Sequence, residues 1–164
     1  MTIANLADDL KSLLDQPVQN IEHATQLARL LAATDARAVA CWQAVGETLE
    51  LAGFWADDEM PSLIQQEFVA AIRSVPLTAS HFGVVQAVLA RGPAVNHRAI
   101  SSGPLPPGSI GWLVRLDAES SLAIPVYQGA NLVGAFAVAT GRRIEPDDQV
   151  WQLLKALAAL LETT

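Results

Sequence analysis

The decisive stretch of this sequence runs Ser121-Leu122-Ala123-Ile124-Pro125-Val126-Tyr127, Gln128-Gly129-Ala130-Asn131, Leu132-Val133-Gly134-Ala135-Phe136-Ala137-Val138-Ala139-Thr140. Its two outer segments are rich in apolar and β-branched residues, which favour strands. Gly129 and Asn131 tolerate the positive φ that a tight hairpin turn requires. The stretch therefore predicts two antiparallel strands over 121–127 and 132–140.

A helix is predicted on the C-terminal side of this hairpin. Glu145-Pro146-Asp147-Asp148 places a proline and acidic residues where a first helical turn favours them. An apolar seam follows, formed by Val150, Leu153, Leu154, Leu157, Leu160 and Leu161. This seam predicts a helix wide enough to cover the sheet and to contact a second subunit.

The N-terminal part predicts two helices and a second hairpin. Leu6, Leu10, Leu13 and Leu14 recur at helical spacing, and Pro17 ends that run. A longer helix is expected from Pro17 to Asp35. Strands over 36–45 and 48–55 are separated by Gly46-Glu47, a short polar joint that suits a hairpin.

The middle of the chain mixes helices with a long loop. A helix is expected to begin at Asp57-Asp58 and to run through Ile72, and a further one to be capped by Ser80 and to end at Gly92-Pro93. Pro93 to Asn96 predicts a short edge strand. The segment from Ile100 to Trp112 holds three prolines and three glycines and predicts a functional lid or a pocket wall.

This order of elements predicts an α+β domain with helices on one face of an antiparallel sheet. With 164 residues, the chain is expected to form an N-terminal helix over 1–16 and a single domain over 17–164. No apolar run approaches the ~20 residues that cross a bilayer, and the N-terminus does not resemble a secretory signal, so we expect no membrane partner and a cytoplasmic location.

Charge and cysteine content narrow the function further. The net charge of −7 speaks against nucleic acid as a partner. Cys41 is the only cysteine, so an intramolecular disulfide and a thiolate metal cage are both excluded. His23, His81 and His97 lack a metal-ligand spacing, and no Ser/His/Asp arrangement stands out. We expect no metal, no cofactor and no catalytic residues.

The C-terminal part of the sequence resembles the C-terminal half of a GAF domain. The resemblance rests on the two apolar segments over 121–127 and 132–138, on Gly129 between them, and on Asp147-Asp148 and Leu153-Leu154. Gly92-Pro93-Ala94-Val95, after a predicted helix, resembles a short segment typical of that family, and the resemblance spans about 17–161. It implies a sheet with the N- and C-terminal helices on one face and a ligand-type pocket on the other. No Asn-Lys-Phe-Asp-type segment of the cyclic-nucleotide branch and no Cys-His pair of the bilin-binding branch is present.

The candidate site lies between residues 80 and 115. Trp112 and Arg115 leave the Gly/Pro-rich loop together, and such a pair can stack on a flat ligand or hold a carboxylate. The alternative is that Trp112 fills the core and Arg115 points to solvent. We predict a cavity lined by some of His81, Phe82, His97, Trp112 and Arg115.

We expect a non-catalytic, small-molecule-sensing regulatory domain of a signalling or transcription-control system, forming a homodimer through its terminal helices. One alternative is a ligand-free dimerisation or protein-interaction module. A second alternative is an enzyme of the free methionine sulfoxide reductase type. That chemistry works through paired cysteines in the family, and Cys41 stands alone in a predicted strand, so the enzyme is disfavoured.

Overall fold

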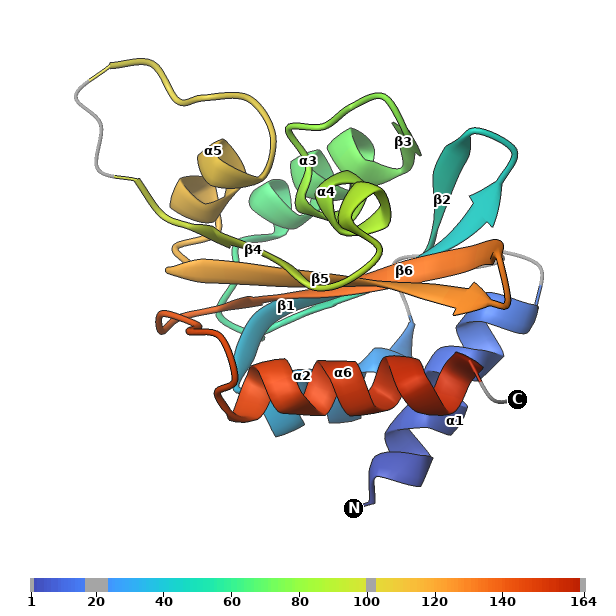
Figure 1. Ribbon diagram of the computed structural model, residues 1–164. Helices are drawn as coiled ribbons and strands as arrows, with labels where there is room; N and C mark the ends of the chain where they lie inside the picture. Colours follow the sequence, from blue (N-terminus) through green and yellow to red (C-terminus); the bar gives the residue numbers. More distant parts are fainter. Residues whose placement is uncertain (1, 17–23, 100–102, 163–164) are drawn as a thin grey trace.

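The computed structural model describes residues 2–16, 24–99 and 103–162, which form one antiparallel sheet between two layers of helices (Figure 1). The strands lie in the order β3-β2-β1-β6-β5-β4. Their bounds are β1 Ala36–Val45, β2 Thr48–Ala56, β3 Ser74–Pro76, β4 Ala94–His97, β5 Ser120–Gln128 and β6 Asn131–Thr140. The helices are α1 Ile3–Asp15, α2 Ala28–Thr34 after a 3-10 turn at Thr25–Leu27, α3 Ser62–Ile72, α4 Gly83–Ala90, α5 Ser109–Arg115 and α6 Gln149–Glu162.

The two helical layers contain different parts of the chain. Helices α1, α2 and α6 cover one face of the sheet, and α3, α4 and α5 lie over the other (Figure 1). The α+β class and the placement of the terminal helices on one face are therefore confirmed. Leu6 and Leu10 of α1 belong to the same apolar core as Leu154 and Leu157 of α6, so the first helix is part of that packing.

Both predicted hairpins are confirmed, with strand ends shifted by one residue at most. Gly129 has the expected positive φ of 62°. The expectation for Asn131 is wrong, because Asn131 does not take a positive φ and instead pairs with Gln128 as the first residue of β6. The turn therefore consists of Gly129 and Ala130 alone.

Several expected helix starts are wrong. The longer helix was expected from Pro17, but residues 17–23 lie outside the described part, and Ala24 is not helical, so α2 begins at Ala28. Helix α3 begins at Ser62, after Pro61, because the Asp57 carboxylate accepts the Glu59 N–H in a turn that precedes it. Helix α4 begins at Gly83 with Phe82 at the capping position, and Ser80 does not cap it.

The terminal helices are fixed by specific polar contacts. Asp148 caps α6, since its carboxylate accepts from the Trp151 N–H at 3.0 Å and from the Glu145 N–H at 3.1 Å. Asp9 of α1 forms a two-point ion pair with Arg29 of α2, at 2.8 and 2.6 Å. None of the helices in the described ranges is long and apolar enough to span a bilayer.

Candidate functional site

A cavity of about 60 Å³ lies between the sheet and helices α3, α4 and α5. Its walls come from three strands, from α3, from the first residues of α4 and from α5. They are Ala38, Val39, Ala40, Trp42, Phe68, Ile72, Phe82, Gly83, Val84, Ser109, Trp112, Leu113, Leu116, Ser121, Ala123, Ala137, Val138 and Ala139. An engineered apolar cavity of about 150 Å³ binds benzene, so this smaller space suits a more compact molecule.

The floor of the cavity is made of small side chains that lie side by side on neighbouring strands. Ala40 of β1, Ala137 of β6 and Ala123 of β5 form one row across the sheet. Ala38, Ala139 and Ser121 form a second row. Alternate residues of a strand point to the same face of the sheet. The alanines at every second position therefore leave space above this face, whereas the other face carries larger residues such as Phe136 and Leu122.

Aromatic side chains form the opposite wall. Phe68 of α3 meets the Trp112 ring edge to face, with ring centroids 4.9 Å apart, and its centroid lies 5.7 Å from that of Phe54. Trp42 extends from the floor and donates its indole N–H to the Ile72 carbonyl at 2.9 Å. These contacts hold α3 and α5 together above the alanine rows.

One end of the cavity is polar. The Ser109 hydroxyl accepts the Gly83 N–H at 2.7 Å, and the Ser109 N–H donates to the His81 carbonyl at 3.0 Å. These bonds tie the start of α5 to the start of α4. Gly108, with φ of 80°, permits them, because a Cβ at this position would collide with the His81 carbonyl oxygen.

The structure places Phe82 and Trp112 on the cavity wall, whereas the side chains expected beside them lie elsewhere. His81 is exposed and contributes its backbone carbonyl. Arg115 forms an ion pair with Glu67 of α3, and its guanidinium carbon lies 4.3 Å from the centroid of the Trp112 ring, on the outer side of the wall. The sequence suggested that Trp112 and Arg115 leave a loop, but both belong to helix α5.

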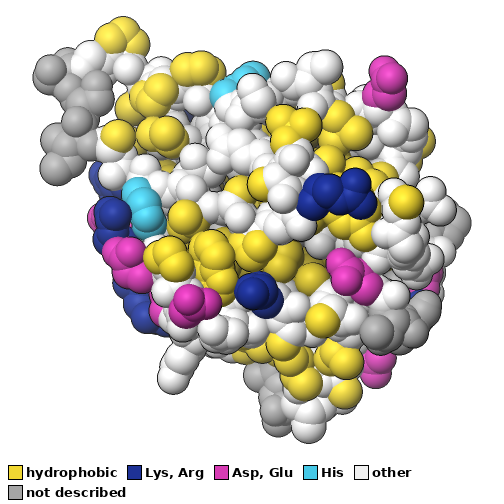
Figure 2. Space-filling model, in the orientation of Figure 1, with side chains coloured by type: hydrophobic (Ala, Val, Ile, Leu, Met, Phe, Trp, Pro, Cys, Tyr) yellow, Lys and Arg dark blue, Asp and Glu magenta, His cyan; other side chains and the backbone are white. Residues whose placement is uncertain are grey.

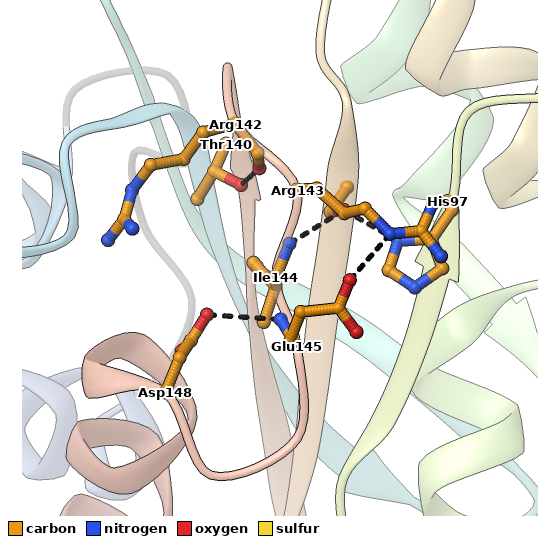
Figure 3. Close-up of polar contacts among 8 residues, drawn as sticks. His97, Thr140, Arg142, Arg143, Ile144, Glu145 and Asp148 are labelled. Atoms are coloured by element: carbon orange, nitrogen blue, oxygen red, sulfur yellow. Dashed lines mark hydrogen bonds and ion pairs between the residues drawn. The ribbon is translucent and has the colours of Figure 1, made fainter.

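His97 does not line the cavity. It lies in a polar group near Arg143 and Glu145 (Figure 3). Its Nδ1 is 2.7 Å from the hydroxyl of Ser120, and that hydroxyl accepts the Ile144 N–H at 3.0 Å. The protonation of the His97 ring decides which of the two atoms, Nδ1 or the Ser120 hydroxyl, donates this bond. Ser120 is fully buried. Through its contacts with His97 and Ile144, it links strand β5 to β4 and to the segment before α6.

Cys41 points away from the cavity. Its side chain belongs to the core between the sheet and α1, α2 and α6, where it is fully buried. Burial raises the pKa of the Cys41 thiol to about 12, because a thiolate would lose its hydration there. The thiol is thus neutral at physiological pH and separated from the cavity by the sheet.

The electrostatics of the cavity are simple. None of the described residues that line it is ionisable. No group of three or more His, Cys, Asp and Glu side chains within residues 2–16, 24–99 and 103–162 is arranged to hold a metal ion. On the face shown in Figure 2, cationic and anionic side chains are interspersed among uncharged ones.

The sequence matches no protein-family model and no curated protein. The structure, in contrast, is similar to solved GAF domains. For the GAF domain of a two-component sensor histidine kinase from Bacillus halodurans, the identity is 17%, 95% of this chain and 90% of that chain are covered, and the TM-score is 0.62. For the phycoerythrobilin-bound GAF domain of a cyanobacterial phytochrome, the identity is 9%, 99% of this chain and 93% of that chain are covered, and the TM-score is 0.60.

An enzyme has the same fold. The type II free methionine-R-sulfoxide reductase from Thermoplasma acidophilum is 12% identical, with 96% of this chain and 93% of that chain covered and a TM-score of 0.55. At such identities the likeness concerns the fold alone. The chain has the GAF fold, with an apolar cavity on the sheet face opposite its terminal helices.

Proposed function

We propose that this chain is a regulatory domain that senses a small molecule in the cavity between the sheet and α3, α4 and α5. The single observation that carries the proposal is the cavity itself, which has a floor of alanines on three adjacent strands and a wall of aromatic side chains. Well-packed interiors contain few voids larger than a water molecule, so a hollow of this kind needs a reason. Binding of a ligand is the reason that fits an apolar space with a polar end.

A signal can leave this site through α3 and α5. Trp112 of α5 contacts both Phe68 and the guanidinium of Arg115, and Arg115 pairs with Glu67 of α3. A ligand that pushes on Trp112 therefore acts on these contacts between the two helices above the cavity. The phytochrome neighbour holds its bilin in a GAF domain, which agrees with small-molecule binding by this fold.

Sensing is favoured over reductase chemistry by the position of Cys41. A thiol that reduces a sulfoxide must reach the substrate and ionise, and the oxidised enzyme then needs a second thiol. Cys41 is the only cysteine, it is buried on the face opposite the cavity, and its pKa is raised to about 12. These properties support a domain without thiol-based catalysis, and a single free cysteine suits the cytoplasm.

A cavity-filling substitution tests the proposal. Ala137 lies in the middle of the floor, and Ala137→Leu would extend an isopropyl group into the space. Equilibrium dialysis against an extract of small metabolites, followed by mass spectrometry, should show a compound enriched by the unmodified protein and not by Ala137→Leu. Ala71→Leu is the matched control, because Ala71 is exposed on α3. Equal enrichment by all three proteins would contradict the proposal.

We also propose a homodimer that forms through the terminal helices. The side of α6 that faces the sheet is buried, yet Trp151 and Leu153 are only partly buried, and Leu160 is 37% exposed. Ile3 of α1 is exposed to the same extent. Light scattering should report a dimer, and Leu160→Glu should shift it toward monomer, whereas Leu63→Glu on α3 should not. A monomer at high micromolar concentration would contradict this assembly.

A further inference from the structure

We infer that the ligand of this cavity is an uncharged, compact molecule with an apolar body and one hydrogen-bond acceptor, which it directs to the hydroxyl of Ser109. The inference rests on the proposed function and narrows it to a chemical class. Three features of the cavity carry it, namely its lack of charge, its size and the state of the Ser109 hydroxyl.

The lack of charge in the lining disfavours an ionised group inside the cavity. None of the described lining residues is ionisable. The nearest candidate among those expected from the sequence, Arg115, lies outside the wall and is engaged by Glu67. A carboxylate or ammonium group in the cavity would lose its hydration without gaining an ion pair, and buried charges are rarely tolerated in that way.

The space inside the cavity is small, although the cavity is partly open to solvent. A volume of about 60 Å³ is less than half of the about 150 Å³ that accommodates benzene. Apolar side chains and backbone make up most of the wall, and the hydroxyl-bearing residues are Ser109 and Ser121. The part of the ligand that enters this space is therefore small and mostly hydrocarbon, with room for a single polar group.

The Ser109 hydroxyl is prepared to donate. A serine hydroxyl has one proton and two acceptor positions. One acceptor position receives the Gly83 N–H at 2.7 Å, and this bond fixes the oxygen at the polar end of the cavity. The proton then points away from Gly83 and can be donated to a ligand. The site is narrow, because a methyl group at Gly83 would lie 3.4 Å from the Ser109 oxygen and 3.0 Å from Asn96 Nδ2.

Three isosteric probes test the class on the unmodified protein. They are 2-butanone, propionate and 2-methyl-1-butene, which share a shape and differ in the group that would face Ser109. Binding is followed by two-dimensional NMR titration of the backbone amides, including those of Gly83, Ser109 and Ala137. We expect 2-butanone to bind about threefold to tenfold more tightly than the alkene, as one neutral hydrogen bond allows. Propionate should bind at least about a hundredfold more weakly than 2-butanone, because the cavity offers no partner for its charge.

Variants then assign the donor. In Ser109→Ala the ketone and the alkene should bind equally, while Ser121→Ala, which removes the other cavity hydroxyl, should keep the preference for the ketone. The inference would be overturned if the preference for the ketone were lost in Ser121→Ala and kept in Ser109→Ala, or if propionate bound most tightly. Either result would still be consistent with small-molecule sensing at this cavity. If none of the three probes shifts the cavity amides, the ligand class is overturned. If, in addition, no metabolite is enriched in the dialysis experiment, the proposed function fails as well.

Discussion

Trp112→Ala is the most informative single substitution for the wall of the cavity. The indole of Trp112 closes the space on the side of α5, contacts the Phe68 ring at 4.9 Å and lies beneath the Arg115 guanidinium at 4.3 Å. Removal of the indole therefore removes three separate contributions to the free energy of unfolding. Each of them has a known size.

The expected loss follows from those contributions. Removing the partly buried indole from its apolar surroundings costs about 2 kcal/mol. The aromatic pair with Phe68 adds about 1 kcal/mol, and the cation–π contact with Arg115 adds about 0.5 kcal/mol. The sum is a loss of about 3.5 kcal/mol in the free energy of unfolding, which lowers the melting temperature of a domain of this size by about 7–14 °C. Arg115→Ala, which loses the cation–π contact and a half-exposed ion pair, should cost about 1 kcal/mol.

Urea unfolding followed by far-ultraviolet circular dichroism measures these values. A double-mutant cycle between Trp112→Ala and Phe68→Leu should give a coupling energy of about 1 kcal/mol. Trp151, which packs on the other face of the sheet, supplies the control, since a cycle of Trp151→Ala with Phe68→Leu should give a coupling near zero. A loss below about 1 kcal/mol for Trp112→Ala, or equal coupling in the two cycles, would refute the description of the wall.

Three further substitutions and treatments test other parts of the structure. Ser120→Ala leaves the buried Ile144 N–H without its acceptor and should cost about 1–3 kcal/mol by urea unfolding, whereas Ser121→Ala should cost far less. Gly108→Ala should destabilise the protein by more than Gly129→Ala, because only the first Cβ meets a backbone carbonyl, and similar melting temperatures would contradict this. Cys41 should resist a thiol reagent at pH 8 until the protein is unfolded. Since its folded pKa of about 12 exceeds the ordinary value of 9.0, stability should fall as pH rises above about 9, and Cys41→Ala should weaken that dependence.

The hairpins and the terminal helices could be predicted because their signals are local and repeated. Apolar runs on both sides of Gly129, and the seam from Val150 to Leu161, extend over enough residues to outweigh any single position. The middle of the chain has no such redundancy. Helix α5 was hidden because Gly108 and Gly111 suggested a loop, and β3 is only three residues long and ends at Pro76. Its pairing with β2 depends on contacts distant in sequence.

The candidate site was predicted in outline and missed in its chemistry. Phe82 and Trp112 line the cavity. Arg115 and His97 were chosen from the sequence because charged and histidine side chains often bind ligands. In the structure they instead contact Glu67 and Ser120, which are 48 and 23 residues away in sequence. That any of the five residues binds a ligand stays a prediction. The alanine floor was visible as a pattern, since alanines recur at every second position from Ala135 to Ala139 and at Ala38 and Ala40. Reading their small size as a hollow on one face required knowing that the two strands pair.

Native mass spectrometry of the freshly purified protein tests most directly whether the cavity binds a small molecule. Spectra of the unmodified chain, of Ala137→Leu and of Ala71→Leu are compared under conditions that preserve non-covalent complexes. We expect a fraction of the unmodified protein and of Ala71→Leu to carry one additional small mass, which is lost on denaturation and is absent from Ala137→Leu. An additional mass that persists in Ala137→Leu, or bare protein in all three samples even after incubation with a metabolite extract, would contradict this expectation.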